Sequence, residues 1–429
     1  MTSPPPPRPD LPRRIVVVGA GLAATQTVAA LRERGFDGRL TVLGAETIPP
    51  YDRPPLSKHL LDRPGPTWLS EELGVDVRTL ADEVRLGSPA TALRVGPSGV
   101  EIDAGTIVEA DVAVVATGAR ARRVPGWEHA LVLHTADDAA ALRARLTPGT
   151  RLVVIGAGWI GAEVAGVAAA AGVEVTVIEA APAPLTGALG TQVGARAMPW
   201  FAAAGVRLVT DARVVRVEPD AVHLADGERV PADVVLAAVG AVPATDWLGA
   251  ALPREPDGSL RVDEGYAVLA APHRVRAVGD VALRRSHRHG WVTGGHWDGA
   301  LRGPVDLATD LLDPSDGPLD GTSDGTSAAH ASDPVPYVFS TQLGHDLTLF
   351  GLPRPGDDVV LRDGAGAGGG DWSALWFRPG SPVLEAVLTV DRPRDVGAAR
   401  RLFAGRDLPR LDRDRAGDVN VPLRDAALA

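Results

Sequence analysis

A strand, a glycine turn, a helix and a second strand followed by an acid occur twice in this chain, in the same order. The first copy is "RRIVVVGAGLAATQTVAALRERG" with "RLTVLGAE", and the second is "TRLVVIGAGWIGAEVAGVAAAAGVEVTVIEAA". The glycines allow a tight turn and let backbone N–H groups approach a pyrophosphate at the positive end of the helix dipole. The repeat predicts two dinucleotide-binding units; the alternative is two buried units whose glycines serve only packing. The residues concerned are Gly19, Gly21, Ala24 and Glu46 in the first copy, and Gly156, Gly158, Gly161 and Glu179 in the second.

Three further segments have the pattern of a strand running into a turn. Residues 110–120 follow the first unit, residues 232–246 follow the second, and residues 273–282 place Asp280 after a short strand. An acid at that point can bind a cofactor hydroxyl, although a plain turn aspartate would look the same. Glu179 is followed by "AAPAP", with no arginine to bind a 2′-phosphate, so the second unit is expected to prefer a dinucleotide without that phosphate.

Composition excludes several classes of protein. With 429 residues, 45% hydrophobic and 23% charged, the chain is typical of a globular protein of two or three domains. The net charge of −11 argues against a nucleic-acid binder, and no apolar run is long enough to span a membrane. The twin arginines before the first strand could suggest an export signal, but the glycine spacing favours a binding turn, and a cytoplasmic location is predicted. The sequence has no cysteine, which excludes thiol chemistry and cysteine-ligated metal sites, and no metal site is predicted.

Lys58, in "YDRPPLSKHLL", is the single lysine of a chain that otherwise uses arginine for its basic residues. The diproline Pro54-Pro55 restricts the backbone before it. An ammonium is a compact point charge, whereas a guanidinium is a wide planar fork. The sequence therefore predicts that Lys58 lies in a site with room for an ammonium but not for a guanidinium. The alternative is a surface lysine without a special role.

Five motifs and the C-terminal tail together resemble one known family. They are "VVVGAGLA", "YDRPPLSK", "VVATGAR", "VVIGAGWIGAEVA", "AVGDVA" and the tail "DRPRDVGAARRLFAGRDL…VPL". They are similar to the oxygenase-coupled ferredoxin reductases, flavoproteins that include putidaredoxin reductase. The resemblance implies an α/β fold with two Rossmann-like, glutathione-reductase-like dinucleotide-binding domains and a C-terminal α+β interface domain. It implies FAD in the first unit and NAD(H) in the second.

The resemblance also implies roles for individual residues. Lys58 would lie beside the flavin N5 and pair with Glu163, and these two are the predicted catalytic residues. Trp159 resembles an aromatic that relatives hold over the flavin, although a packing role is equally compatible with its position. The remaining predicted cofactor-binding residues are Arg53, Ala90, Thr117, Gly118, His134, Ile160, Gly240, Asp280 and Trp297.

The resemblance gives the domain boundaries, and local composition gives the leader and the linker. A disordered leader is expected at 1–12, an FAD-binding domain at 13–120 and 241–310, and an NAD-binding domain at 121–240. A flexible linker at 311–334 precedes the interface domain at 335–429. The chain departs from the family pattern at His134, Gly295, Phe339 and Thr341, which puts flavin affinity and acceptor choice in question.

Without cysteines, a flavin reduced by NADH must pass its electrons to an external acceptor. The predicted function is electron transfer from NADH through FAD to a ferredoxin that serves a cytochrome P450 or a Rieske-type oxygenase, by a monomer or homodimer. Alternatives are an NADH oxidase or quinone reductase, and a redox-sensing protein resembling apoptosis-inducing factor. A basic patch must attract an acidic ferredoxin to a chain of net charge −11. The candidates are Arg284, Arg285 and Arg288, and secondly Arg400 and Arg401.

Overall fold

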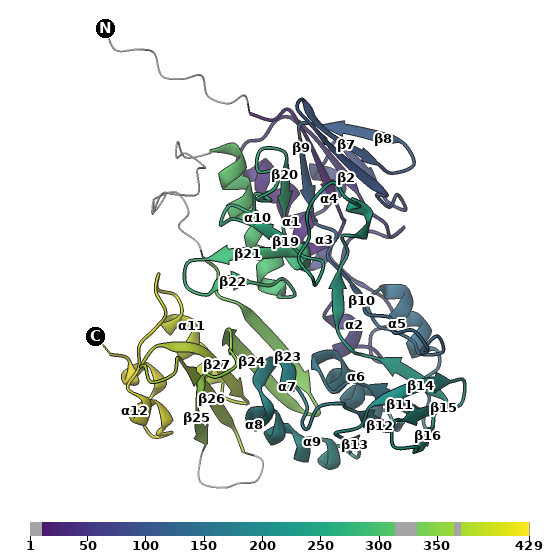
Figure 1. Ribbon diagram of the computed structural model, residues 1–429, viewed down its shortest axis with the longest axis vertical. Helices are drawn as coiled ribbons and strands as arrows, with labels where there is room; N and C mark the ends of the chain where they lie inside the picture. Colours follow the sequence, from purple (N-terminus) through teal and green to yellow (C-terminus); the bar gives the residue numbers. More distant parts are fainter. Residues whose placement is uncertain (1–10, 314–332, 364–369, 429) are drawn as a thin grey trace. The chain divides into compact units, whose positions relative to one another are not determined.

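The computed structural model describes residues 11–313, 333–363 and 370–428. These residues form two compact units, which are described separately (Figure 1). Most of the predicted leader and linker lies outside the described residues. Unit 1 contains residues up to 51, 68–119 and 243–334, and unit 2 contains 52–67, 120–242 and 335–429.

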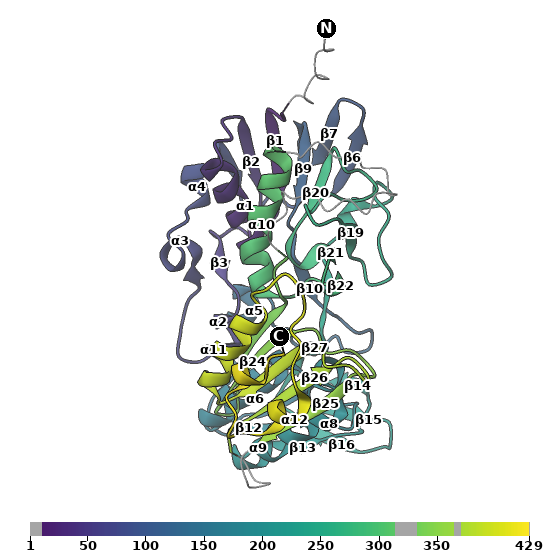
Figure 2. The same cartoon turned by 90° about the vertical axis from the view of Figure 1, so that its left-hand side faces the viewer.

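Unit 1 is built on a five-stranded parallel sheet in the order β20-β9-β1-β2-β5. Its central strands are runs of valine, isoleucine, leucine and alanine, as expected for strands buried on both faces. Helix α10 packs beside α1 (Figure 2), and both contribute to the core of the unit. The strands are β1 (Arg14–Val18), β2 (Arg39–Leu43), β5 (Glu83–Arg85), β9 (Val112–Val115) and β20 (Val275–Ala277); the helices are α1 (Leu22–Glu33) and α10 (Trp297–Leu312).

Two smaller sheets complete unit 1. One is the antiparallel sheet β6-β7-β8, whose apolar side chains join the same core, and the other is β19-β21-β22. Their strands are β6 (Ala92–Gly96), β7 (Gly99–Asp103), β8 (Ile107–Ala110), β19 (Leu260–Val262), β21 (Ala282–Ser286) and β22 (Gly290–Val292). Short helices are α3 (Leu69–Glu72), α4 (Val77–Leu80), η2 (Asp246–Leu248) and η3 (Gly279–Val281).

Unit 2 contains a parallel sheet in the order β13-β12-β11-β17, with α6 after β11. An antiparallel sheet, β14-β15-β16, packs its apolar residues against β11 and β17. The strands are β11 (Arg151–Ile155), β12 (Glu174–Ile178), β13 (Arg207–Val209), β14 (Val214–Glu218), β15 (Ala221–Leu224), β16 (Arg229–Pro231) and β17 (Val234–Ala237). The helices are α2 (Pro55–Lys58), α5 (Ala136–Arg143), α6 (Trp159–Ala170), α7 (Thr186–Leu189), α8 (Thr191–Gly194), η1 (Ala195–Ala197) and α9 (Met198–Ala203).

The C-terminal part of unit 2 is an antiparallel sheet in the order β23-β24-β27-β26-β25. Its strands are β23 (Tyr337–Gln342), β24 (His345–Gly351), β25 (Asp358–Asp363), β26 (Trp372–Phe377) and β27 (Leu384–Val390), followed by α11 (Pro393–Leu402), α12 (Arg413–Gly417) and η4 (Leu423–Ala426). Where the chain passes between the units, β3 (Tyr51–Asp52) pairs with β4 (Thr67–Trp68), and β10 (Ala119–Ala121) with β18 (Ala241–Pro243).

The predicted fold class is confirmed: the chain has two α/β dinucleotide-type sheets and a C-terminal α+β part. The three segments predicted as strands before turns contain β9, β17 and β20, and each extends one of the two parallel sheets. The exact domain boundaries stay a prediction. Within the described residues, no helix combines the length and the apolar composition needed to cross a membrane.

Candidate functional site

The first glycine of each turn is required by its own backbone conformation and by the protein atoms around it. Gly19 has a φ of +121°, and a Cβ placed there would lie 2.1 Å from the carbonyl oxygen of Ala116. Gly156 has a φ of +103°, and its Cβ would lie 2.6 Å from the carbonyl oxygen of Ala238. Both positions combine a left-handed backbone with close approach to a neighbouring strand end, so no other residue fits them.

The second glycine of each turn has no such internal reason. Gly21 (φ −91°) and Gly158 (φ −79°) have ordinary backbone angles, and a Cβ on either would meet no protein atom within 4 Å among the described residues. Each is the N-cap of a helix, α1 or α6, and has no side chain to cap the free N–H groups there. An open space at a helix N-terminus fits a phosphate group that approaches the backbone closely.

The third position of each motif is packed. Ala24 is fully buried, and a Cβ on Gly161 would lie 2.0 Å from the carbonyl oxygen of Gly156. The alternative that all the glycines serve packing therefore accounts for the first and third positions but leaves the second unexplained. The residues present fit a dinucleotide at both turns.

Asp280 links the start of α10 to the first glycine turn. Its Oδ1 accepts a hydrogen bond of 3.1 Å from the N–H of Gly295, and a Cβ on Gly279 would lie 3.0 Å from the Cβ of Ala23 in α1. Gly295 has a φ of +98°, so the residue that departs from the family pattern also suits this turn. The structure thus brings Asp280, the α10 N-terminus with Trp297, and the α1 N-terminus together.

His296, the N-cap of α10, has a buried polar atom that fits a ligand. The residue is partly buried, and its Nδ1 has no hydrogen-bond partner in the part of the chain that the structure describes. Burial lowers the pKa of His296 to about 4. A buried ring nitrogen of this kind is normally satisfied, and a polar group of a bound cofactor could supply its partner.

Acidification is expected to destabilise the protein through His296. Because the folded pKa lies below the usual value of 6.5, the unfolded chain takes up this proton first, and stability is lost as the pH falls from 6.5 towards 4. The expected loss is on the order of 1–3 kcal/mol, measured by chemical denaturation of cofactor-free protein at pH 7 and pH 4.5. His296→Gln should lose less stability than the wild type over this range, whereas His129→Gln, at an exposed histidine, should follow the wild type. Identical pH dependence in all three proteins would contradict the assignment.

The acids that follow the second strand of each repeat, Glu46 and Glu179, differ in their surroundings. Glu179 follows β12 directly and accepts hydrogen bonds from the N–H groups of Ala157 (2.7 Å) and Ala181 (2.9 Å), so it contacts the second glycine turn. Glu46 lies three residues beyond the end of β2, and its carboxylate accepts a hydrogen bond of 2.6 Å from the hydroxyl of Tyr51. The observed strand β2 is therefore shorter than the predicted strand "RLTVLGAE", which extended to Glu46.

The other predicted cofactor residues fall into the two units. In unit 1, Thr117 donates a hydrogen bond of 2.7 Å to the carbonyl of Ala244, next to Gly118 with its φ of +68°, and Ala90 is partly buried against the core. In unit 2, Arg53 Nη1 donates a hydrogen bond of 2.6 Å to the backbone carbonyl of His134.

The residues at the α6 N-terminus and the turn after β17 complete the set in unit 2. Trp159 packs against the apolar cluster of the C-terminal sheet, which agrees with a packing role, and the neighbouring Ile160 is exposed. Gly240, with a φ of +95°, accepts a hydrogen bond from the N–H of Arg122. Their contact with a cofactor stays a prediction.

Lys58 is not a surface lysine. Its side chain is 15% exposed and its Nζ donates to Oε1 of Glu163, whose side chain is 5% exposed. Lys58 ends the short helix α2, which begins at Pro55, and Glu163 lies in α6; the two helices pack against each other. The Nζ also lies 5.3 Å from the ring centroid of Phe339. The structure brings the two predicted catalytic residues into an ion pair.

Three residues beside this ion pair were not among those predicted. Ser57 and Ser340 both donate to the carboxylate of Glu163, and Gln342 donates to Ser340. Ser57 lies in the "PPLSK" motif, and Ser340 and Gln342 lie in "VFSTQL". The motifs themselves were the available signal, but neither shows that serine and glutamate meet.

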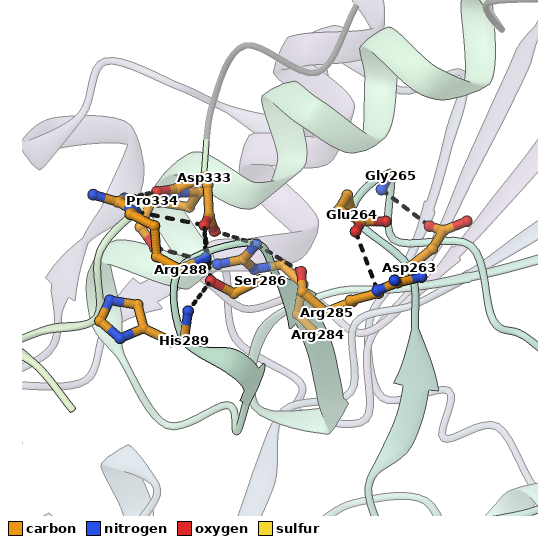
Figure 3. Close-up of polar contacts among 10 residues, drawn as sticks. All are labelled: Asp263, Glu264, Gly265, Arg284, Arg285, Ser286, Arg288, His289, Asp333 and Pro334. Atoms are coloured by element: carbon orange, nitrogen blue, oxygen red, sulfur yellow. Dashed lines mark hydrogen bonds and ion pairs between the residues drawn. The ribbon is translucent and has the colours of Figure 1, made fainter. Parts of the chain in front are cut away.

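The prediction that Arg284, Arg285 and Arg288 together form an exposed basic docking patch is wrong. Arg284 and Arg288 are turned inward and bind Asp333, with Arg284 Nη1 at 2.8 Å from Asp333 Oδ1 and Arg288 donating to the Asp333 backbone carbonyl (Figure 3). Their guanidinium groups satisfy a partly buried carboxylate. Burial alone would raise the pKa of Asp333, but the Arg284 charge and the hydrogen bonds to the carboxylate lower it. Only Arg285 of the three is exposed, and it pairs with Glu264.

Comparison with known proteins identifies the family. A family model for pyridine nucleotide-disulphide oxidoreductases matches residues 13–302, and one for a reductase C-terminal region matches residues 337–427. The chain belongs to the pyridine nucleotide-disulphide oxidoreductase family. Within this family it resembles the ferredoxin reductases, and the predicted recognition, enzyme class and cofactors FAD and NAD(H) are confirmed.

Relatives within the pyridine nucleotide-disulphide oxidoreductases match over the whole length. The chlorobenzene dioxygenase ferredoxin reductase component of Cupriavidus sp. (strain PS12) is 33% identical, over 97% of this chain and 98% of the relative. Putidaredoxin reductase of Pseudomonas putida is 30% identical over 97% of each chain. The fold is similar to that in a covalent putidaredoxin reductase–putidaredoxin complex, with a TM-score of 0.81, 26% identity, and coverage of 96% of this chain and 98% of the other.

Proposed function

We propose that this chain oxidises NADH and reduces a ferredoxin, with FAD as the intermediate carrier. One NADH supplies a hydride, two oxidised ferredoxins each take one electron, and NAD⁺ and a proton are released. The observation that carries the proposal is the pair of glycine turns, at Gly21 and Gly158, that leave open space at two helix N-termini in a chain without cysteine. Relatives named as ferredoxin reductase components support the ferredoxin as acceptor.

The chain's own residues bind and orient in this proposal. FAD, when bound, accepts electrons in a pair and releases them singly. Unit 1 would hold FAD through the N–H groups at Gly21, the ring nitrogen of His296 and Asp280. Unit 2 would hold NADH at Gly158, with Glu179 near the ribose. Lys58, fixed by Glu163, would place one positive charge beside the flavin.

An anaerobic mixing experiment tests the proposal. Protein loaded with FAD is reduced with NADH and then mixed with candidate two-iron ferredoxins, with a quinone, and with oxygen. Rapid reoxidation by a ferredoxin and slow reoxidation by the others are expected. Rapid reoxidation by oxygen or quinone alone would favour the small-acceptor alternative, and a long-lived reduced complex in every mixture would favour the redox sensor. The proposal includes a cytoplasmic location, where NADH is available.

The second unit is expected to prefer NADH over NADPH. The Glu179 carboxylate would repel a 2′-phosphate, so Glu179→Gln should narrow the ratio of the two kcat/KM values about fivefold, roughly 1 kcal/mol. Glutamine is chosen because Glu179 accepts hydrogen bonds from Ala157 and Ala181, and an amide can keep one acceptor there. Steady-state kinetics with both nucleotides give the ratio; a wild type that prefers NADPH would overturn the assignment.

A further inference from the structure

The carboxylate of Glu163 receives three donors, not one. Lys58 Nζ and Ser340 Oγ both donate to Oε1, and Ser57 Oγ donates to Oε2 at 2.5 Å. Ser57, Glu163 and Ser340 are all buried, with 5%, 5% and 3% of their surfaces exposed. A buried carboxylate needs such partners, since each unpaired ion would be strongly destabilising.

The direction of each hydrogen bond is fixed by its neighbours. Gln342 Nε2 donates to Ser340 Oγ at 3.1 Å, so the single hydroxyl proton of Ser340 is available for Glu163. Gln342 is itself buried. The chain of donors therefore runs in one direction, from Gln342 through Ser340 to the carboxylate, and each O–H or N–H dipole directs its positive end at Glu163.

The fold holds β23 tightly against α6 at this point. A Cβ on Gly166 of α6 would lie 2.9 Å from the backbone nitrogen of Leu343, so only glycine allows this approach. Leu343 (φ +51°) and Gly344 (φ +88°) form the two-residue turn between β23 and β24, a geometry that both left-handed angles specify. The strand that contains Ser340 and Gln342 is thereby set in register with Glu163.

We infer that Ser57, Ser340 and Gln342 are positioning residues that fix Glu163 and, through it, the ammonium of Lys58. The inference rests on the proposed function for its catalytic meaning, but the network itself lies entirely in unit 2. The C-terminal sheet then also affects this site. Its strand β23 contains Ser340 and Gln342, and through them it determines how strongly Glu163 neutralises Lys58.

The sign of the effect follows from the dipoles. Ser340→Ala removes an O–H dipole whose positive end points at the Glu163 carboxylate. The negative charge of Glu163 is then less compensated, and it interacts more strongly with Lys58. Less positive potential remains for the negative charge that the reduced cofactor acquires. Ser340→Ala should therefore favour the oxidised cofactor, whereas Ser340→Thr, which keeps a hydroxyl, should stay near the wild type.

The single lysine allows a direct test without cofactor. Protein labelled with ¹³C at the lysine ε position gives one signal, from Lys58. In cofactor-free protein this signal should shift in Ser340→Ala, Ser57→Ala and Gln342→Leu. It should not shift in Thr341→Val, a matched control on the opposite face of β23, because Thr341 bonds to exposed Asp346 (2.8 Å) instead. An unchanged Lys58 signal in Ser340→Ala and Ser57→Ala would overturn the network.

A redox titration tests the consequence in the FAD-loaded protein. Ser340→Ala is expected to shift the equilibrium with a reference dye about threefold towards the oxidised form, ~14 mV for a two-electron couple. The Kd for NADH and the FAD occupancy should stay at wild-type values, and Ser340→Thr should restore the equilibrium. If Thr341→Val shifts it equally, or threonine fails to rescue, the positioning role is wrong. Wild-type protein that binds no FAD would instead refute the proposed function and leave the apo-protein result standing.

Discussion

Lys58→Met is expected to slow the reduction of bound FAD by NADH at least about tenfold, a barrier increase of roughly 1.4 kcal/mol. Methionine keeps the length of the side chain and removes its charge. The charge should matter because the Lys58 ammonium is largely buried and its counter-ion, Glu163, shares its own charge among three donors. Part of the positive potential is then left for the flavin. Stopped-flow absorbance of the flavin measures the rate.

Lys58→Arg separates charge from shape. The guanidinium keeps the charge but needs more room, and the space beside Glu163 Oε1 is already shared with the Ser340 hydroxyl. We expect lower FAD occupancy or a rate as slow as that of Lys58→Met. His59→Ala, at the next residue, whose ring bonds to exposed Asp62, should behave as the wild type.

A loss of folding must be distinguished from a loss of chemistry. Lys58→Met leaves Glu163 without its ion pair, and breaking a buried pair costs about 3–5 kcal/mol when one charge remains. The double variant Lys58→Met with Glu163→Gln removes both charges and should recover much of the stability while FAD reduction stays slow. Wild-type reduction rates in both Lys58→Met and Lys58→Arg would refute the role of the lysine.

The features that could be predicted from the sequence are those that depend on residues close together in the chain. The turn at Gly19 and Gly21 is defined by neighbouring residues, and its form follows from the backbone angles that only glycine adopts and from helix N-termini. The pairing of Lys58 with Glu163 was inferred from the family resemblance rather than from spacing, because 105 residues separate them.

The remaining contacts depend on packing over long sequence separations. Ser340 reaches Glu163 across 177 residues, and Asp333 reaches Arg284 across 49. Nothing in "LRRSHRHGW" shows that Arg284 turns inward, since strand alternation gives either face until the register of β21 is known, and Arg288 lies beyond that strand, in the turn before β22. The same limit explains why arginine density was a poor guide to a docking surface.

The second docking candidate, Arg400 with Arg401, has a stronger physical basis, and three arginines nearby in the sequence extend it. Arg394, Arg400 and Arg401 are exposed on α11, whose opposite face packs into the C-terminal core. Arg406 and Arg410 follow in the next segment and are exposed too. None of these five, which we call the α11 patch, forms an ion pair with another described residue, in contrast to the paired Arg284 and Arg288.

Arg400→Glu with Arg401→Glu is therefore expected to slow ferredoxin reduction at least about tenfold at low ionic strength. A chain of net charge −11 repels an acidic partner at long range, and only a local excess of positive charge can guide the encounter. The difference from the wild type should shrink as salt is raised, because exposed charges are screened beyond about 10 Å at 0.1 M. Stopped-flow mixing of reduced protein with an acidic ferredoxin gives the rate.

Two controls separate a docking site from a general charge effect. Arg34→Glu with Arg94→Glu changes the net charge equally at exposed positions of unit 1, and it should slow the reaction far less. Arg285→Glu tests the one exposed arginine of the first candidate, whose charge Glu264 already balances, and should also have a small effect. Reduction of a small neutral acceptor should be unchanged in every variant, because no docking is needed. If the unit 1 variant and the α11 variant lose the same amount, net charge rather than the α11 patch determines the encounter, and the ferredoxin must be guided by another surface.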